Sequence, residues 1–520
     1  MNPIELNLFG SRVAAICDEM GVVLRRTAFS PNIKDRLDFS CALFDRAGEL
    51  FAQAAHIPVH LGSMAYAMGG IVGQRDWQAG DMLVLNDPYL GGTHLPDVTV
   101  IAPVFAASGF NAKEATLLGF VANRAHHANI GCDTPGSMPV SSSLDEEGII
   151  IPPTWLLRGG KLQDHGIALP DMQGGKLSGD IAAQVGANQV GSARLQELVH
   201  SIGTAAFVQG VSELNAYADR LMAVAISQLQ PGAYQFADLL DDDGCGSRDI
   251  PLAVTLTITP AAIVLDFSAS AAQVPGNLNC PESVVAAAAY YCLRCLLPDA
   301  APACAGLFRR VQLVTRPASI INAERPAAVA AGNVETSMRL VDLVFGALAQ
   351  ALPERIPAAS QGTMNNVAMG HIDAESGTRW DYYETLAGGI GGGPRYAGLD
   401  AVHSHMTNSL NTPIESLEMH YPLRVTNYSV RVGSGGAGLH RGGNGIVREY
   451  EFLAAAQCSL LTERRRVPPW GLHGGSPGAC GRNFLNGAEL PAKCTLNVSA
   501  GDRLRIETPG AGGWGKVPLC

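Results

Sequence analysis

The residues best suited to chemistry in the first hundred positions are His94 and Asp97, which close the segment NDPYLGGTHLPD. Pro96 lies between them. It lacks an amide hydrogen and disfavours regular helix, so both side chains are expected on a fixed loop. The preceding pair Gly91-Gly92 allows a tight backbone turn and a close approach to a bound group. This spacing predicts a loop that presents an imidazole and a carboxylate to one ligand.

A second histidine cluster, His126-His127, follows a strand-like run at 118–122. Imidazole nitrogen and carboxylate oxygen together suit Mn, Zn or Fe in the +2 state, and three or four such ligands leave a position for water. The alternative is that these histidines only form hydrogen bonds in the core. We expect a divalent metal site that combines this cluster with the 94–97 loop.

Two further histidine pairs could line the same site. His56 and His60 have helical spacing, but Pro58 between them argues against one continuous helix. Substrate contact, support of the metal ligands and plain packing are all open for this pair. His403 and His405 alternate as residues of a strand do, which predicts that they share a face. The candidate substrate contacts are His56, His60, His403, His405 and Asn408.

Nucleotide-binding and nucleophile signatures are weak in this sequence. No GxxxxGK[ST] segment is present, and a GxGxxG match at 433–438 is followed by another glycine-rich run and a strand-like segment, where a phosphate-binding helix should begin. We interpret this match as tight turns between strands. The residues therefore favour metal-assisted hydrolysis, or a related addition to a carbonyl, over nucleotide chemistry.

Composition narrows the class of protein. The chain has 520 residues, of which 47% are hydrophobic and 16% charged, so it can bury large cores and is not generally disordered. The net charge of −11 argues against nucleic acid or an anionic membrane surface as a partner. No apolar stretch approaches the roughly 20 residues of a membrane span, and no secretory signal is visible. Twelve cysteines without a disulfide rhythm are expected to be reduced thiols of a cytoplasmic protein.

Hydrophobic periodicity predicts a mixed α/β fold in several parts. Apolar residues at helical spacing predict helices up to Leu24, across 179–229, and at 281–297 and 334–352. Short alternating or apolar runs predict strands at 40–44, 82–85, 98–104, 118–122, 254–258, 262–267, 428–432, 446–452 and 459–462. We expect an α/β portion with the metal site at 1–178, a helical segment at 179–235, a second α/β portion at 236–360 and a β-rich, glycine-rich portion at 361–520, intertwined rather than separate.

Several long segments together resemble one known family. They are SPNIKDRLDFSCALFD, QAAHIPVHLGSM, NDPYLGGTHLPDVT, RAHHANIG, AGNVETSMRLVD, PAASQGTMNN, VHSHMTNSLNTPIESLE, RRRVPPWGLHGG and TPGAGGWG. In this order they resemble the hydantoinase B family. That family comprises the B subunits of ATP-dependent hydantoinases and oxoprolinases, related lactamases, and the metal-bearing subunit of acetone carboxylase. The resemblance covers essentially the whole chain.

The resemblance implies a division of labour between two subunits. An A subunit would bind ATP and phosphorylate the amide oxygen of a cyclic substrate, such as a hydantoin or an oxoproline-like lactam. The B subunit would hold a divalent metal and direct water onto the activated carbon, in an A2B2-type assembly. Carried onto this sequence, the ligands would be His94, Asp97 and one histidine of the pair His126 or His127, of which we favour His126, with Asp38 as a further ligand. Asp97, His126 and His127 would be the catalytic residues, with His127 supporting His126 or carrying a proton.

Departures from the family pattern and two alternatives leave the substrate open. Asn129 stands where relatives usually have Asp after the histidine pair, and Glu463 replaces an Asp before the arginine run. One alternative is a subunit of an ATP-dependent carboxylase of the acetone carboxylase type. Another is a non-catalytic assembly subunit whose metal site has decayed, against which the intact pair of His94 and Asp97 argues.

Overall fold

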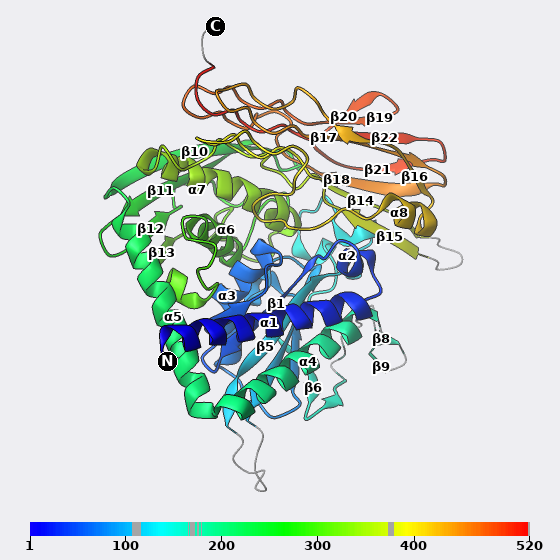
Figure 1. The fold of residues 1–520 in the computed structure, drawn as a ribbon. Helices are drawn as coiled ribbons and strands as arrows, with labels where there is room; N and C mark the ends of the chain where they lie inside the picture. The colour runs from blue at the N-terminus through cyan, green and yellow to red at the C-terminus, as the bar shows by residue number, and fades with distance from the viewer. Residues whose placement is uncertain are drawn as a thin grey trace.

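The computed structural model describes residues 1–106, 116–164, 166, 172–173, 176–177, 179–372 and 379–517, and every structural statement below concerns these residues. The boundary that we placed after residue 178 falls just outside them. The mixed α/β fold predicted from the sequence is confirmed (Figure 1).

The N-terminal part is built on a seven-stranded sheet in which all neighbouring strands are antiparallel. Its order is β2 (Leu50–Gln53), β1 (Phe39–Asp45), β5 (Leu117–His126), β4 (Asp97–Phe105), β3 (Met82–Leu85), β6 (Thr154–Arg158) and β7 (Lys161–Leu162). The strands predicted at 40–44, 82–85, 98–104 and 118–122 are confirmed as β1, β3, β4 and β5.

Helices cover both faces of this sheet. Neighbouring strand residues such as Val100 and Ile101 point to opposite faces and enter different hydrophobic clusters. Helices α1 (Pro3–Thr27), α4 (Gly179–Ile202) and α5 (Thr204–Ser227) supply one cluster, and α3 (Pro58–Val72) supplies the other. Figure 1 shows α1 and α4 running side by side across the sheet. Helix α1 starts at a capping box formed by Asn2 and Glu5.

The middle part packs two helices against a four-stranded sheet. The sheet has the order β10 (Gly232–Asp242), β11 (Arg248–Ile258), β12 (Ile263–Asp266) and β13 (Val311–Val314), in which β12 and β13 are parallel. The antiparallel pairing of β11 with β12 confirms the predicted hairpin. Helix α6 (Glu282–Arg294) packs on α3, and α7 (Ser337–Ala351) is almost entirely buried. A π-helical turn, Gly332–Thr336, leads into α7.

The C-terminal part contains two further antiparallel sheets, drawn from yellow to red at the opposite end of Figure 1 from β6. One has the order β15 (Arg379–Glu384), β14 (Asn366–Ile372), β18 (Ala456–Leu461) and β21 (Lys493–Val498). The other has the order β16 (Leu423–Val430), β17 (Ile446–Phe452), β22 (Arg503–Glu507), β19 (Arg482–Leu485) and β20 (Ala488–Leu490). The smaller elements are α2 (Pro31–Lys34), β8 (Met172–Gln173), β9 (Lys176–Leu177), α8 (Ile414–His420) and the 3-10 turns Pro88–Leu90, Pro135–Ser137, Leu144–Glu146 and Ala305–Phe308.

The glycine-rich segments of this part lie backbone against backbone. The amide of Gly443 donates to the carbonyl of Ile390, and its own carbonyl accepts from Ala511, both at 2.9 Å. A Cβ atom at Gly443 would lie 1.9 Å from the carbonyl oxygen of Leu399, so only glycine fits. The GxGxxG match at 433–438 forms turns in this layer with no helix after it, which confirms our interpretation. Within the described residues, no helix is long and apolar enough to cross a membrane.

Candidate metal centre

One edge of the N-terminal sheet gathers the residues that the sequence singled out. Asp97 is the first residue of β4, and it pairs across the ladder with His126, the last residue of β5. Asp38 directly precedes β1, on the other side of β5, and its carbonyl accepts a hydrogen bond of 3.0 Å from the amide of His126. Because neighbouring strands are antiparallel, the start of β4, the end of β5 and the start of β1 meet at the same edge.

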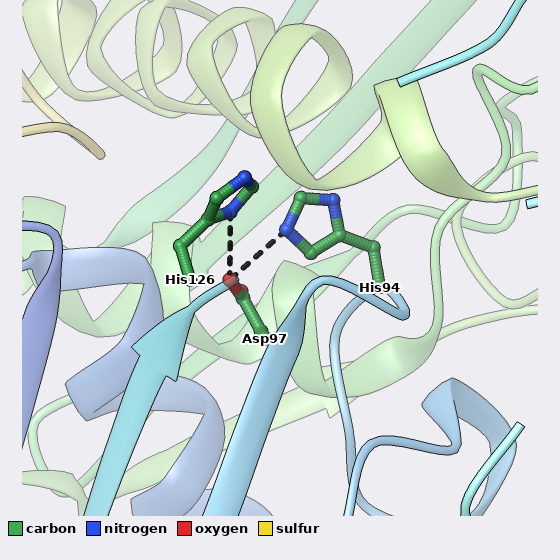
Figure 2. Close-up of side chains that lie close together, drawn as sticks. All are labelled: His94, Asp97 and His126. Carbon is green, nitrogen blue, oxygen red and sulfur yellow. Dashed lines mark hydrogen bonds and ion pairs between the residues drawn. The ribbon is translucent and has the colours of Figure 1, made fainter. Parts of the chain in front are cut away.

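Asp97 is the centre of a buried cluster with two imidazoles. Its Oδ1 lies 3.0 Å from His94 Nε2 and 3.2 Å from His126 Nδ1. Figure 2 shows both rings turned toward this oxygen, His94 from the loop before β4 and His126 from the end of β5. None of the three residues is more than 2% exposed. Ligand atoms of the three lie within 4.8 Å of one another, which is close enough to share one ion. We call these residues the metal cluster.

The hydrogen bonds of the His94 ring show which of its two nitrogens carries the proton. Nδ1 lies 3.1 Å from the carbonyl oxygen of Ala330, and a carbonyl can only accept, so Nδ1 carries a proton. In the neutral ring, Nε2 is then an acceptor that faces the Asp97 carboxylate, and it has no other partner. Two acceptors at 3.0 Å repel unless the ring is protonated or a cation lies between them. The donor set therefore fits a divalent cation, with the tautomer of a metal ligand already fixed.

Burial and the neighbouring charges shift the pKa values of the three residues of the metal cluster. Burial raises the pKa of Asp97, but His60, His94 and His126 outweigh it and hold that pKa well below the ordinary range. Burial lowers the pKa of His94, yet Asp97 more than compensates and the net shift is upward. For His126 burial dominates, and its pKa is lowered.

His60 and Asp38 extend the cluster on one side. His60 is in the first turn of α3, and its Nε2 lies 3.2 Å from Asp97 Oδ2 and 3.9 Å from Asp38 Oδ1. The helix begins at Pro58, so His56 lies outside it, and the prediction that one continuous helix does not carry both histidines is confirmed. His56 faces away from the cluster: its Nδ1 accepts from the amide of Cys41, and its ring packs edge-on against Phe39.

Asp97 Oδ2 also receives two hydrogen bonds that the sequence did not suggest. Thr93 donates from its hydroxyl at 2.7 Å, and Asn333 donates from its side-chain amide at 3.3 Å. Asn333 belongs to the π-helical turn before α7, and it is separated from Asp97 by more than two hundred residues. Thr93 belongs to the NDPYLGGTHLPD motif, and this position next to His94 is the feature of the sequence that could have indicated its role.

The ring of Tyr383 holds His126 from the C-terminal part of the chain. It stacks on the imidazole with ring centres 4.6 Å apart, and its hydroxyl donates to Asn366 at 2.6 Å. The guanidinium of Arg36 lies 5.0 Å from the centre of the Tyr383 ring and 3.6 Å from the carboxylate of Asp38. Three parts of the chain therefore enclose His126, and nothing in the local sequence around Tyr383 marked it as part of the site.

Glu147 fixes the backbone segment that holds the His94 ring. Its carboxylate accepts from the amides of Val329 and Ala330, both at 2.9 Å, and from the hydroxyl of Ser141 at 2.8 Å. The carbonyl of Ala330 is the group that fixes the His94 ring. Burial raises the pKa of Glu147 to about 7.

His127 lies away from the metal cluster. Its Nε2 lies 3.0 Å from the side-chain oxygen of Gln184 in α4, on the face of the sheet that α4 covers. Gln184 also donates to Val98 and Asn123, so this histidine joins a network that fixes α4 on β4 and β5. Asn129 accepts from Gly131 within a local turn.

The expectation that His403 and His405 share the face of a strand is wrong. Both lie in a loop, where His405 adopts a left-handed backbone conformation (φ 57°) that breaks the alternation. His405 Nε2 lies 3.5 Å from Asp342, and its Nδ1 lies 3.4 Å from the hydroxyl of Tyr291. His403 is buried near Arg36, and burial followed by that charge lowers its pKa to about 4. Asn408 is exposed and contacts the carbonyl of His56.

Comparison with known proteins identifies the family of this chain. Residues 2–517 match the family described as hydantoinase B/oxoprolinase, and the chain belongs to that family. It is 38% identical to an uncharacterised protein of Methanocaldococcus jannaschii, over 99% of this chain and 91% of that one. It is 30% identical to a putative D-/L-hydantoinase B subunit of Pseudomonas sp., over 99% and 90%. The 5-oxoprolinase of Dictyostelium discoideum is 38% identical over 99% of this chain, which spans only 40% of that protein.

Two solved structures share the fold. The ATP-dependent caprolactamase from Pseudomonas jessenii superimposes with a TM-score of 0.88 at 26% identity, covering 100% of this chain and 92% of that one. Nucleotide-free acetone carboxylase superimposes with a TM-score of 0.86 at 18% identity, covering 99% and 76%, and this likeness concerns the fold alone.

Proposed function

We propose that this chain is the metal-bearing B subunit of an ATP-dependent cyclic amidohydrolase, acting on a hydantoin, an oxoproline-like lactam or a related cyclic amide or imide. The observation that carries the proposal is the buried Asp97 oxygen shared by His94 and His126. The relatives named as 5-oxoprolinase, D-/L-hydantoinase and caprolactamase support the substrate class.

The residues present fit a Mn, Zn or Fe ion in the +2 state. His94, Asp97 and His126 would hold it, with Asp38 as a further ligand, and the ion would act as a Lewis acid toward water and a substrate oxygen. Thr93 and Asn333 fix the Asp97 carboxylate, and Ala330 fixes the His94 ring. His60 Nε2 faces the carboxylates of Asp97 and Asp38, and it would help to fix Asp97 by donating a hydrogen bond to its Oδ2. We assign His127 a positioning role through Gln184.

A separate A-type subunit would supply ATP and phosphorylate the amide oxygen. This division is supported by the length of the 5-oxoprolinase relatives, which carry more than half of their chain outside the matched region. We propose an A2B2-type assembly in the cytoplasm. The cellular location is supported by the free thiols: every cysteine among the described residues is unpaired.

The test is ring opening by the pair of subunits purified together. Hydantoin, 5-oxoproline and caprolactam would be offered with and without ATP, and product amino acids would be measured. We expect ATP-dependent opening of at least one ring by the wild-type pair and none by the His94→Ala pair. Equal rates from both pairs would overturn the role of the cluster. Bicarbonate-dependent ATP turnover without ring opening would instead identify a carboxylase.

A further inference from the structure

The metal cluster borders a cavity that is too small for any ring substrate. Its volume is 20 Å³, and its lining includes Asp38, His60, Asp97, His126, Met364 and Met406. That volume admits about one water molecule, whereas pockets for organic ligands measure roughly 300–1,000 Å³. A cyclic amide can reach the cluster only if part of the lining moves.

We call this small cavity the inner cavity. A second cavity lies on the other side of one of its walls. It has a volume of 640 Å³ and is lined by residues of α3, of α6 and of the loops beside them, among others His56, Pro58, Tyr290, Tyr291 and Asn408. We call it the vestibule. Its size suits a drug-sized or smaller molecule, and its tyrosines and histidine provide both flat apolar faces and polar atoms.

The wall between the two cavities contains two short segments of backbone, residues 55–59 and 406–409, which we call the first and the second strip. Along the first strip the residues alternate: His56 and Pro58 line the vestibule, whereas Ile57 and Val59 line the inner cavity. Along the second strip, Asn408 lines the vestibule. Its neighbours Met406, Thr407 and Ser409 line the inner cavity. The same two segments, through alternate residues, therefore separate the vestibule from the inner cavity.

The two strips are joined weakly. The amide of Val59 donates to the carbonyl of Met406, and the side chain of Asn408 donates to the carbonyls of Ala55 and His56, all at 3.4 Å. This length is beyond the usual 2.7–3.2 Å range of N–H···O bonds. Beyond the joint, the second strip is held more firmly, because the amide of Leu410 donates to the carbonyl of Arg36 at 2.8 Å.

We propose that the substrate reaches the metal cluster from the vestibule by parting these two strips, and that the buried side chain of Met406 sets the size of the ring that is admitted. This inference rests on the proposed function for the identity of the substrate. We assign this role to Met406 because it is fully buried in the lining of the inner cavity and because its unbranched side chain can change rotamer. Ala55, His56 and Asn408 then form the first contacts of an arriving ring.

Two variants test the route in the co-purified pair of subunits. Ala55 is exposed and lines the vestibule, so Ala55→Trp narrows the route without disturbing a core. Ala261→Trp, at an exposed turn away from the vestibule, is the matched control. We expect Ala55→Trp to lower kcat/KM for ring opening by about tenfold, a typical effect of pocket contacts, with the metal content unchanged. Equal kcat/KM for the two variants would overturn the route.

An internal variant tests Met406 even if the vestibule variant disturbs the assembly with the A subunit. Met406→Ala should raise the ratio of kcat/KM for caprolactam over 5-oxoproline by about tenfold. Met369→Ala is the control for a general loosening of the packed core, because Met369 in β14 is equally buried but does not line the inner cavity. If both variants shift the ratio equally, Met406 does not set ring size. A wild-type pair without ATP-dependent ring opening would instead overturn the proposed function, and the route with it.

Discussion

The Thr93 hydroxyl offers a sharp quantitative test of the metal cluster. It is fully buried and donates to Asp97 Oδ2 at 2.7 Å. Thr93→Val removes this donor and keeps the shape of the side chain. A hydrogen bond to a charged group contributes about 1.5–3 kcal/mol. Since about 1.4 kcal/mol corresponds to a tenfold change in an equilibrium constant, the variant should bind metal roughly 10- to 100-fold more weakly, in line with other supports of metal ligands.

The assay is titration of the metal-free chain with Mn²⁺ or Zn²⁺ in competition with a chromophoric chelator. Thr93→Ser is the matched control, because it keeps the hydroxyl and loses only a methyl group. We expect Thr93→Ser to bind within a few-fold of the wild type and Thr93→Val to bind far more weakly. If Thr93→Val binds metal as tightly as Thr93→Ser, the orientation of Asp97 does not govern the site and the reasoning is refuted.

Two further predictions follow from the geometry. His126→Ala should abolish tight metal binding in calorimetry while His127→Ala retains it, because only the first ring faces Asp97; the reverse result would exchange their roles. Glu147 has a pKa raised to about 7 by burial, whereas the unfolded carboxyl ionises near about 4.3. The wild-type protein therefore loses stability as pH rises through this window, by up to roughly 1.4 kcal/mol per pH unit. In Glu147→Gln this contribution is absent, so its melting temperature should fall less between pH 5 and 8, and parallel curves for the two proteins would contradict this origin. Glu335, whose pKa burial also raises to about 7, is common to both proteins and cancels in the comparison.

The elements that carry the site were predictable because their signals are local. The spacing of Phe9, Val13, Ile16 and Met20 predicts α1, and all four are buried in it. The apolar runs at 98–104 and 118–122 predict β4 and β5. Because these strands are antiparallel neighbours, the loop that ends at Asp97 and the strand that ends at His126 meet at one edge, which brings the predicted residues together.

The rest of the site depends on contacts between distant parts of the chain. Asn333, Tyr383 and Arg36 come from a π-helical turn, from the C-terminal part of the chain and from the segment after α2, and no periodicity relates them to the loop at 94–97. The strand expected at His403 and His405 is a loop, because alternation in the sequence carries no information about a residue such as His405 that adopts a left-handed backbone conformation.

The central claim is that ring opening needs the ion held by His94, Asp97 and His126. The most direct test removes metal from this chain alone by chelation, restores the ATP-binding partner with Mg²⁺ and ATP, and measures ring-opened product before and after addition of one equivalent of Mn²⁺, Zn²⁺ or Fe²⁺ per chain. We predict no product from the metal-free chain and recovery with at least one of the three ions. Full product formation by the metal-free chain would contradict the claim.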